Sequence, residues 1–283
     1  MLVNSKTILN KAKKNSYAIG QFNTSSIETT RAIFGAAVKL KSPVIIATSE
    51  KEAEHLGIEN IAAIVGSFAA KVNVPIILHL DHGKDFNLIK RALLAGYTSI
   101  HFDGSELPFL KNINLTRKIV AQAKKSGASV EGEVGHIRSH YYKEEKVELK
   151  EQLTDPKEAL EFVRRTGVNS LAIAIGTVHG ACKGKMKLDF KRLKLIANIV
   201  RIPLVLHGAS LLSSKNYRLL IKNGISKINI NTELRLVLIS TIKKIMKNNP
   251  GEYIPYKIFG PAIPEIEKVV ENKIKIFGSI NKA

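Results

Sequence analysis

Residues 75–85 read PIILHLDHGKD, an apolar run that ends on Asp81 and His82 just before a glycine. A buried strand that ends on titratable side chains is typical of α/β enzymes, whose catalytic groups lie where strands end and the following loops begin. His79 lies inside the same run. Whether other strands of the chain end in the same way therefore decides how the whole sequence is interpreted.

Short β-type runs and amphipathic, helix-length stretches alternate along the chain. One such stretch, residues 25–40, carries Ile27, Ile33 and Ala37 near one face. Eight β-type runs occur, at residues 17–23, 43–49, 75–81, 97–103, 128–134, 169–176, 202–208 and 225–231. Strands that are each followed by a helix predict the α/β class and a (β/α)₈ TIM barrel.

A doubly wound open sheet is the structural alternative, but no G-x-G-x-x-G pattern follows the first run. The chain has 283 residues, of which 45% are apolar, enough for a sizeable core. No linker or low-complexity segment interrupts it. Residues 1–283 are therefore predicted to form a single TIM-barrel domain.

Apolar runs and cysteine content bear on where the protein works. No run of about 18 uninterrupted apolar residues is present, and the N-terminal segment lacks the continuous apolar length of a secretory signal. The single cysteine, Cys182, excludes an internal disulfide and suits a reducing compartment. These features predict a cytoplasmic protein with no membrane partner.

The formal net charge of +20 favours either a polyanionic partner or a surface of solvated lysines. No RNA-type aromatic motif, zinc-finger spacing or basic run of five residues accompanies the charge. We therefore predict no nucleic-acid partner. The positive charge is expected to draw anionic substrates at long range, an effect that salt screens.

Polar residues suited to catalysis collect at the ends of the predicted strands, which a TIM barrel gathers on one rim. His82, His179 and His207 follow three different strands, and three histidines make the ligand set of a catalytic zinc site with an open fourth position. His79 and His101 lie within strands and are predicted to be interior hydrogen-bonding residues. The strand-end residues are Ser49, Asp81, His82, Asp103, Glu131, Glu133, His179, His207, Asn229 and Asn231.

Glycine-containing segments after the later strands are candidates for phosphate binding. They lie at residues 179–185, 207–210 and 229–233. Their backbone N–H groups fall at turns and helix starts, which suit an anion. Late strands of TIM barrels often bind phosphate.

The chain resembles the class II, zinc-dependent ketose-bisphosphate aldolases over nearly its whole length. The resemblance is carried by YAIGQFN, LHLDHG, FDGSELPF, VEGEVG, AIGTVHG, PLVLHGAS, KININTE and FGSINKA. The order and spacing of the LHLDHG, VHG and LHG motifs make it specific. The resemblance implies an aldehyde-lyase that takes a small phosphorylated sugar.

Carried over by position, the resemblance implies that His82, His179 and His207 bind Zn²⁺. It also implies that Asp81 exchanges a proton with the C4 hydroxyl during cleavage, and that Asn229 steadies the enediolate. Asp103 and Glu133 are additional candidate ligands. The implied substrate contacts are Ser49, Gly180, Gly208, Ala209, Ser210, Asn229, Ile230, Asn231 and Thr232. A monovalent cation, Na⁺ or K⁺, is implied near Val178, Gly180 and Gly208.

The implied reaction is cleavage of fructose 1,6-bisphosphate to dihydroxyacetone phosphate and glyceraldehyde 3-phosphate, as in glycolysis and gluconeogenesis. Tagatose 1,6-bisphosphate and the 6-phospho-5-dehydro-2-deoxygluconate of inositol breakdown are alternative substrates. An alternative of another class is a zinc-binding relative with little activity and an interaction role. By resemblance the chain is expected to form a homodimer or homotetramer.

Three departures from the family pattern affect these expectations. Residues 136–146 read HIRSHYYKEEK where the family has a Gly-Gly-Glu loop with a second acid/base. Tyr256 stands in place of an arginine that contacts the far phosphate, and Leu211 replaces a glycine. The sequence therefore predicts an intact metal and ketone-phosphate half beside an altered aldehyde half.

Overall fold

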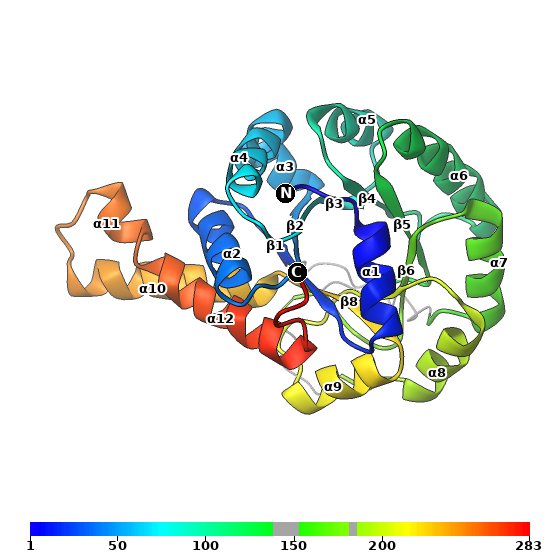
Figure 1. Cartoon of the computed structure of the whole chain (residues 1–283). Coiled ribbons are helices and arrows are strands. Elements are labelled where there is room, and N and C mark those ends of the chain that lie inside the picture. The colour runs from blue at the N-terminus through cyan, green and yellow to red at the C-terminus, as the bar shows by residue number, and fades with distance from the viewer. Residues whose placement is uncertain (138–152, 181–185) are drawn as a thin grey trace, which may run out of the picture.

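Eight parallel strands close into a barrel in the computed structural model, which describes residues 1–137, 153–180 and 186–283 (Figure 1). The predicted (β/α)₈ fold is confirmed. The strands are β1 Ile19–Asn23, β2 Val44–Ser49, β3 Ile76–Gly83, β4 Ser99–Phe102, β5 Ser129–Val134, β6 Ser170–Ile173, β7 Leu204–Leu206 and β8 Ile225–Ile230. Seven lie inside the predicted runs, whereas β3 extends two residues further, through His82 and Gly83.

Helices surround the barrel, with more of them than one per strand. Two follow β2, one precedes β1, and three follow β8. They are α1 Ser5–Lys14, α2 Ile27–Lys39, α3 Glu50–Leu56, α4 Ile58–Ala70, α5 Phe86–Ala95, α6 Phe109–Lys125, α7 Pro156–Thr166, α8 Phe190–Ile199, α9 Ser214–Lys222, α10 Thr232–Asn248, α11 Pro255–Phe259 and α12 Ala262–Phe277. The amphipathic stretch at residues 25–40 forms α2. The helix begins directly after its N-cap, Ser26, whose side chain accepts a hydrogen bond from Thr29 N.

One end of the barrel is closed by α1, which crosses it in Figure 1. Leu9 and Ala12 of this helix pack with Ile19, Ile45 and Ile77, which lie near the beginnings of β1, β2 and β3. Most of the remaining apolar core lies between the strands and the surrounding helices. The opposite end of the barrel, where the strands have their carboxyl ends, is therefore left for the functional side chains. We call this end the mouth.

Helices α10 and α11 project from the barrel, and α12 returns to pack against α2 (Figure 1). Only Thr232 and Leu234 of the 17-residue α10 are buried. Tyr256 lies on α11 with 73% of its surface exposed. Among the residues described, no helix is long and apolar enough to cross a membrane.

Candidate metal and active site

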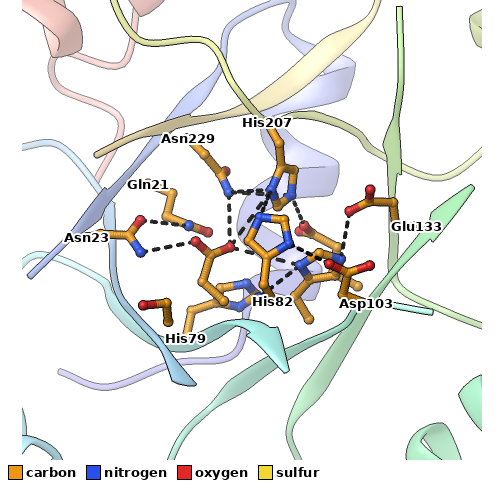
Figure 2. Close-up of polar contacts among 12 residues, drawn as sticks. Gln21, Asn23, His79, His82, Asp103, Glu133, His207 and Asn229 are labelled. Atoms are coloured by element: carbon orange, nitrogen blue, oxygen red, sulfur yellow. Dashed lines mark hydrogen bonds and ion pairs between the residues drawn. The ribbon is translucent and has the colours of Figure 1, made fainter. Parts of the chain in front are cut away.

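Histidine and carboxylate side chains from β3 and β5 and from the segments directly after β4 and β7 meet at the mouth, as the sequence predicted (Figure 2). His82 and Asp81 come from the end of β3, and His207 follows β7 directly. The His82 ring lies 4.6 Å from that of His207 and 5.1 Å from that of His179, between centroids. The three histidines that the resemblance assigns to zinc are therefore neighbours in space.

His82 and His207 each bind a carboxylate through one ring nitrogen and face each other through the other nitrogen. Nδ1 of His82 donates to Asp103 Oδ2 at 2.9 Å, and Nε2 of His207 donates to Glu131 Oε1 at 2.8 Å. The remaining nitrogens, His82 Nε2 and His207 Nδ1, are 2.9 Å apart. A carboxylate on the far nitrogen is the usual support of a metal-binding histidine, so the pair suits a metal ion.

His179 supplies a third nitrogen at the same place. Its Nε2 is buried and has no hydrogen-bond partner among the described residues. The ring lies 6.1 Å from that of His207. His179 is nevertheless absent from the tightest potential ligand group, which joins Asp81, His82, His101 and His207 within 4.8 Å. A buried nitrogen without a partner and two carboxylate-supported imidazoles fit a nitrogen-preferring divalent ion.

The three histidines differ in protonation because their neighbours differ. Burial lowers the pKa of His82, but Asp81 and Asp103 outweigh it and raise the value to about 10. Burial and the His82 cation lower the pKa of His179 to about 3 and hold the pKa of His207 well below its usual value. A protonated His82 can therefore donate from Nε2 to Nδ1 of a neutral His207, which accounts for the short contact between these two atoms.

Asp81, the predicted acid/base, lies beside this histidine pair. Its carboxylate accepts from Asn23 Nδ2 at 3.0 Å and from Asn229 Nδ2 at 3.3 Å. Burial would raise the pKa of Asp81, but His82, His207 and Lys227 together lower it below its usual range. Asp81 is therefore ionised and able to accept a proton.

Asn229, the predicted enediolate contact, is oriented by two partners. Its Nδ2 donates to Asp81 and also lies 3.2 Å from His207 Nδ1. Its Oδ1 is buried without a hydrogen-bond partner among the described residues. The side chain therefore presents its amide to the same point as Asp81 and His207.

Asp103 and Glu133, the additional candidate ligands, form a second group with His82 within 4.8 Å. Burial and the Asp103 charge raise the pKa of Glu133. The Glu133 Oε2 atom lies 3.3 Å from His101 Nε2. Both carboxylates thus lie on the β4–β5 side of His82.

A buried lysine at the site escaped the sequence analysis. Lys227 in β8 is 1% exposed, and its Nζ donates to Glu131 Oε2 at 2.7 Å. Burial alone would raise the pKa of Glu131, but Lys227 lowers it to about 2, so the carboxylate that supports His207 is ionised. Lys227 lies two residues before Asn229 and so shares its strand face, a signal that the sequence did contain.

His79 and His101 are interior hydrogen-bonding residues, as predicted. His79 Nδ1 lies 2.7 Å from Ser99 Oγ, and His101 Nδ1 accepts from the His82 backbone N–H at 3.2 Å. His101 also belongs to the tight ligand group, which the sequence analysis did not anticipate. Strand alternation alone could not tell a supporting histidine from a ligand.

The predicted phosphate segments lie close together. Gly180 and Gly208 have φ values of +94° and +62°. A side chain at Gly208 would meet the Val178 backbone at 2.8 Å, so the loops after β6 and β7 touch there. Ser210 Oγ accepts from the Asn231 backbone N–H at 3.3 Å, which joins the loop after β7 to the start of α10.

The other predicted substrate residues differ in how they are placed. Ala209 is buried and its carbonyl accepts from the Tyr217 hydroxyl at 2.6 Å. Ile230 packs in the core, while Thr232 begins α10. Ser49 lies at the end of β2, where it caps α3. Residues 138–146 of the altered loop and residues 181–185 of the first candidate phosphate segment, which include Cys182, lie outside the described residues.

Comparisons with known proteins agree with this geometry. The profile of the family described as "Fructose-bisphosphate aldolase class-II" matches residues 3–282. A fructose-bisphosphate aldolase from Geobacillus stearothermophilus is 39% identical over 100% of this chain and 99% of that protein. A fructose-bisphosphate aldolase from Staphylococcus epidermidis is 38% identical, with the same coverage.

Solved structures agree as well. The YdjI aldolase from Escherichia coli K12 superposes with a TM-score of 0.88 at 34% sequence identity, and both chains are covered completely. A fructose-bisphosphate aldolase from Campylobacter jejuni superposes with a TM-score of 0.83 at 22% identity, over 100% of this chain and 97% of that one. At this lower identity the likeness concerns the fold alone.

Proposed function

The chain belongs to the class II fructose-bisphosphate aldolase family, and from that premise we propose that it cleaves the C3–C4 bond of fructose 1,6-bisphosphate. The products are dihydroxyacetone phosphate and glyceraldehyde 3-phosphate. The observation that carries the proposal is the pair of carboxylate-supported histidines, His82 and His207, beside the ionised Asp81.

We assign the metal ion to His82, His179 and His207, with zinc as the expected metal. Zinc bound there supplies a Lewis acid that polarises the substrate ketone. The support for this set is the buried, unpartnered Nε2 of His179 and the facing nitrogens of the other two rings. Glu131 and Asp103 keep those two rings in the required tautomer.

Asp81 acts as the base in the cleavage direction. Its carboxylate accepts the proton of the C4 hydroxyl, the C4–O bond becomes the aldehyde carbonyl, and the C3–C4 bond pair passes to the ketone half. Asn229 lies next to both Asp81 and His207, so its amide is suited to hydrogen-bond the oxygen on which negative charge develops. Protonation of C3, which the resemblance assigns to the second acid/base in the loop at residues 136–146, completes the reaction.

The phosphate of the ketone half is assigned to the segments after β7 and β8. Gly208, Ala209 and Ser210 approach the start of α10 through the contact between Ser210 and Asn231. Backbone N–H groups at such a turn and helix start favour a phosphate. Gly208 lies against the Val178 backbone nearby, and the resemblance implies Na⁺ or K⁺ near these two residues and Gly180.

A cytoplasmic homodimer or homotetramer completes the proposal. The projecting α10 supports it, because Leu236, Ile239 and Met246 are 48%, 48% and 38% exposed on a helix that buries little of itself. Large exposed apolar side chains on one element favour protein contacts. Sedimentation of the purified chain would test the stoichiometry.

Steady-state cleavage of fructose 1,6-bisphosphate by the zinc-loaded protein, coupled to detection of dihydroxyacetone phosphate, tests the proposed function. We expect turnover that a chelator abolishes and added zinc restores. Zinc bound without turnover on this substrate, on tagatose 1,6-bisphosphate and on 6-phospho-5-dehydro-2-deoxygluconate would instead indicate the zinc-binding relative with an interaction role.

A further inference from the structure

Glu52, in the first turn of α3, gathers hydrogen-bond donors from three separate parts of the mouth. Its side chain is 6% exposed. Oε2 accepts from Ser49 N at 2.8 Å, from Ser49 Oγ at 3.0 Å and from Asn23 Nδ2 at 3.1 Å. Oε1 accepts from Asn231 Nδ2 at 3.3 Å and from the Arg235 guanidinium. We call these five residues the Glu52 cluster.

The Glu52 cluster borders the proposed proton-transfer residue. Ser49 is the β2 partner of Asp81 in the register of β2 and β3. Asn23 Nδ2 contacts both Glu52 Oε2 and Asp81 Oδ2, so one amide group separates the two carboxylates. If the C4 hydroxyl lies at Asp81, the aldehyde half that begins at C4 lies next to Asn23 and Ser49 of this cluster, whereas Asn231 and Arg235 lie at the start of α10, beside the segment assigned to the ketone-half phosphate.

The donors of the cluster resemble an anion site that the chain fills with its own carboxylate. A backbone N–H, a hydroxyl, two side-chain amides and a guanidinium are groups that bind phosphate well. Here each of them donates to Glu52. A phosphate dianion at this place would have to displace a nearly buried carboxylate or lie against its negative charge, and both are unfavourable.

We propose that Glu52 is a specificity residue that removes the advantage of a second phosphate, so the protein cleaves ketose 1-phosphates at least as well as 1,6-bisphosphates. This inference rests on the proposed aldol cleavage and names its substrate class. The aldehyde half preferred at Glu52 carries hydroxyl groups, which donate to a carboxylate. Tyr256 agrees with the proposal, because it is 73% exposed on α11 and supplies no positive charge.

Arg235 supports the opposite hypothesis, in which the site binds a second phosphate. It lies in the first turn of α10, its side chain is 42% exposed, and it pairs with Glu52. A guanidinium held in this way could take the second phosphate itself. Glu52 beside Arg235 carries the same sign of charge as a phosphate, and the four other donors already bind Glu52, so both observations favour the single-phosphate hypothesis. A variant of Arg235 distinguishes the two hypotheses.

The test compares kcat/KM for fructose 1,6-bisphosphate with kcat/KM for fructose 1-phosphate in the zinc-loaded protein and its variants. We expect a bisphosphate-to-monophosphate ratio of about 1 or less in the unaltered chain. Glu52→Gln removes the charge at nearly constant volume and should raise the ratio at least about tenfold, the size of one hydrogen bond to a charged group. Glu52→Ala, which also opens space, should raise it further.

Glu54→Gln is the matched control, because it removes a carboxylate from the exposed face of the same helix. Its ratio should equal that of the unaltered chain. A preference for the bisphosphate of 100-fold or more in the unaltered chain would overturn the proposal, as would a ratio that Glu52→Gln leaves unchanged. A fall in the ratio in Arg235→Gln would overturn it too and assign the second phosphate to Arg235.

Calorimetric binding to zinc-loaded Asp81→Ala separates this inference from the proposed function. Affinities for the two sugar phosphates are measured there without turnover, with and without Glu52→Gln. Equal or tighter binding of fructose 1-phosphate that reverses with Glu52→Gln supports the role of Glu52 even if the unaltered enzyme cleaves neither sugar. Binding of the bisphosphate at least tenfold tighter, unaffected by Glu52, would refute it.

Discussion

The two sides of the barrel mouth use carboxylates in opposite ways. On the side formed by β3 to β7, Asp103 and Glu131 bind the outer nitrogens of His82 and His207 and leave the inner nitrogens facing each other. On the side formed by β1, β2 and the start of α10, Glu52 instead receives the donors itself. The histidine side presents ring nitrogens that suit a cation, whereas on the other side the donors already bind the Glu52 carboxylate.

This difference shows that one part of the barrel rim can keep the family pattern while another part of the same rim departs from it. The histidine side retains His82, His179, His207 and Asp81, whereas the loop that the resemblance assigns to the second acid/base is altered in sequence. The Glu52 side contains an internal carboxylate, and the exposed Tyr256 lies on the projecting α11. Under the two proposals above, the chemistry of cleavage and the choice of aldehyde fall to separate groups of side chains, which can be perturbed separately.

The largest expected effect separates metal binding from proton transfer. His207→Ala should lose zinc and lower turnover by about 10³-fold or more, because the metal contributes several kcal/mol to the transition state. Asp81→Ala should lower turnover by about 10²–10⁴-fold while zinc content stays near one per chain. Metal analysis beside the kinetics distinguishes them, with His55→Ala, at an exposed position of α3, as a control. Loss of zinc in Asp81→Ala would mean that Asp81 binds the metal.

Lys227→Met tests the support of the histidine side from within the barrel. The change leaves Glu131 buried without its cation, which should lower the free energy of unfolding by about 3–5 kcal/mol. Because Glu131 orients His207, zinc affinity should also fall by about 10–100-fold. Denaturant unfolding and competition with a chelator measure the two effects. Lys227→Met together with Glu131→Gln should recover part of the stability, and an additive loss would contradict the pairing.

The pH dependence of the metal-free protein provides a third test. The folded pKa of His82, about 10, lies above the ordinary value of 6.5. The stabilisation from this cation is therefore fully present below pH about 6.5 and is lost as pH rises through about 10. Unfolding of chelator-treated protein between pH 6.5 and 10 should show a falling free energy, whereas His82→Gln should show less dependence. An equal slope in both proteins would contradict the assigned proton.

The smallest expected effect concerns Leu211 near the phosphate segment. It has a φ of +66°, a left-handed conformation that costs a branched side chain about 1–2 kcal/mol. Since its side chain is 49% exposed, Leu211→Gly should raise the free energy of unfolding by about 0.5–1 kcal/mol. Leu219→Gly in α9, partly exposed on a helix, should instead destabilise by about 1 kcal/mol. Denaturant unfolding of both variants checks the contrast.

The strands and the strand-end residues could be predicted because their signals are local. An apolar run of four to eight residues followed by a titratable group is visible without neighbours, and the closed barrel then brings those ends together. The α3–α4 pair after β2 and the three helices after β8 were less predictable, because the number of helices in a connection depends on what covers the barrel.

By itself, the sequence determined the barrel, the histidine set and the place of Asp81, because strand alternation and chain order fix which residues reach the rim. Only the tertiary structure decided how Lys227 pairs with Glu131 across the barrel and how Glu52 collects donors from β1, β2 and α10. The Lys227 pair and the contacts of Glu52 with β1 and α10 join residues 29 to 183 positions apart, whereas Ser49 of β2 lies three residues from Glu52 in a local capping box. Their partners are chosen by closure of the sheet, which no local pattern of charge or hydrophobicity records.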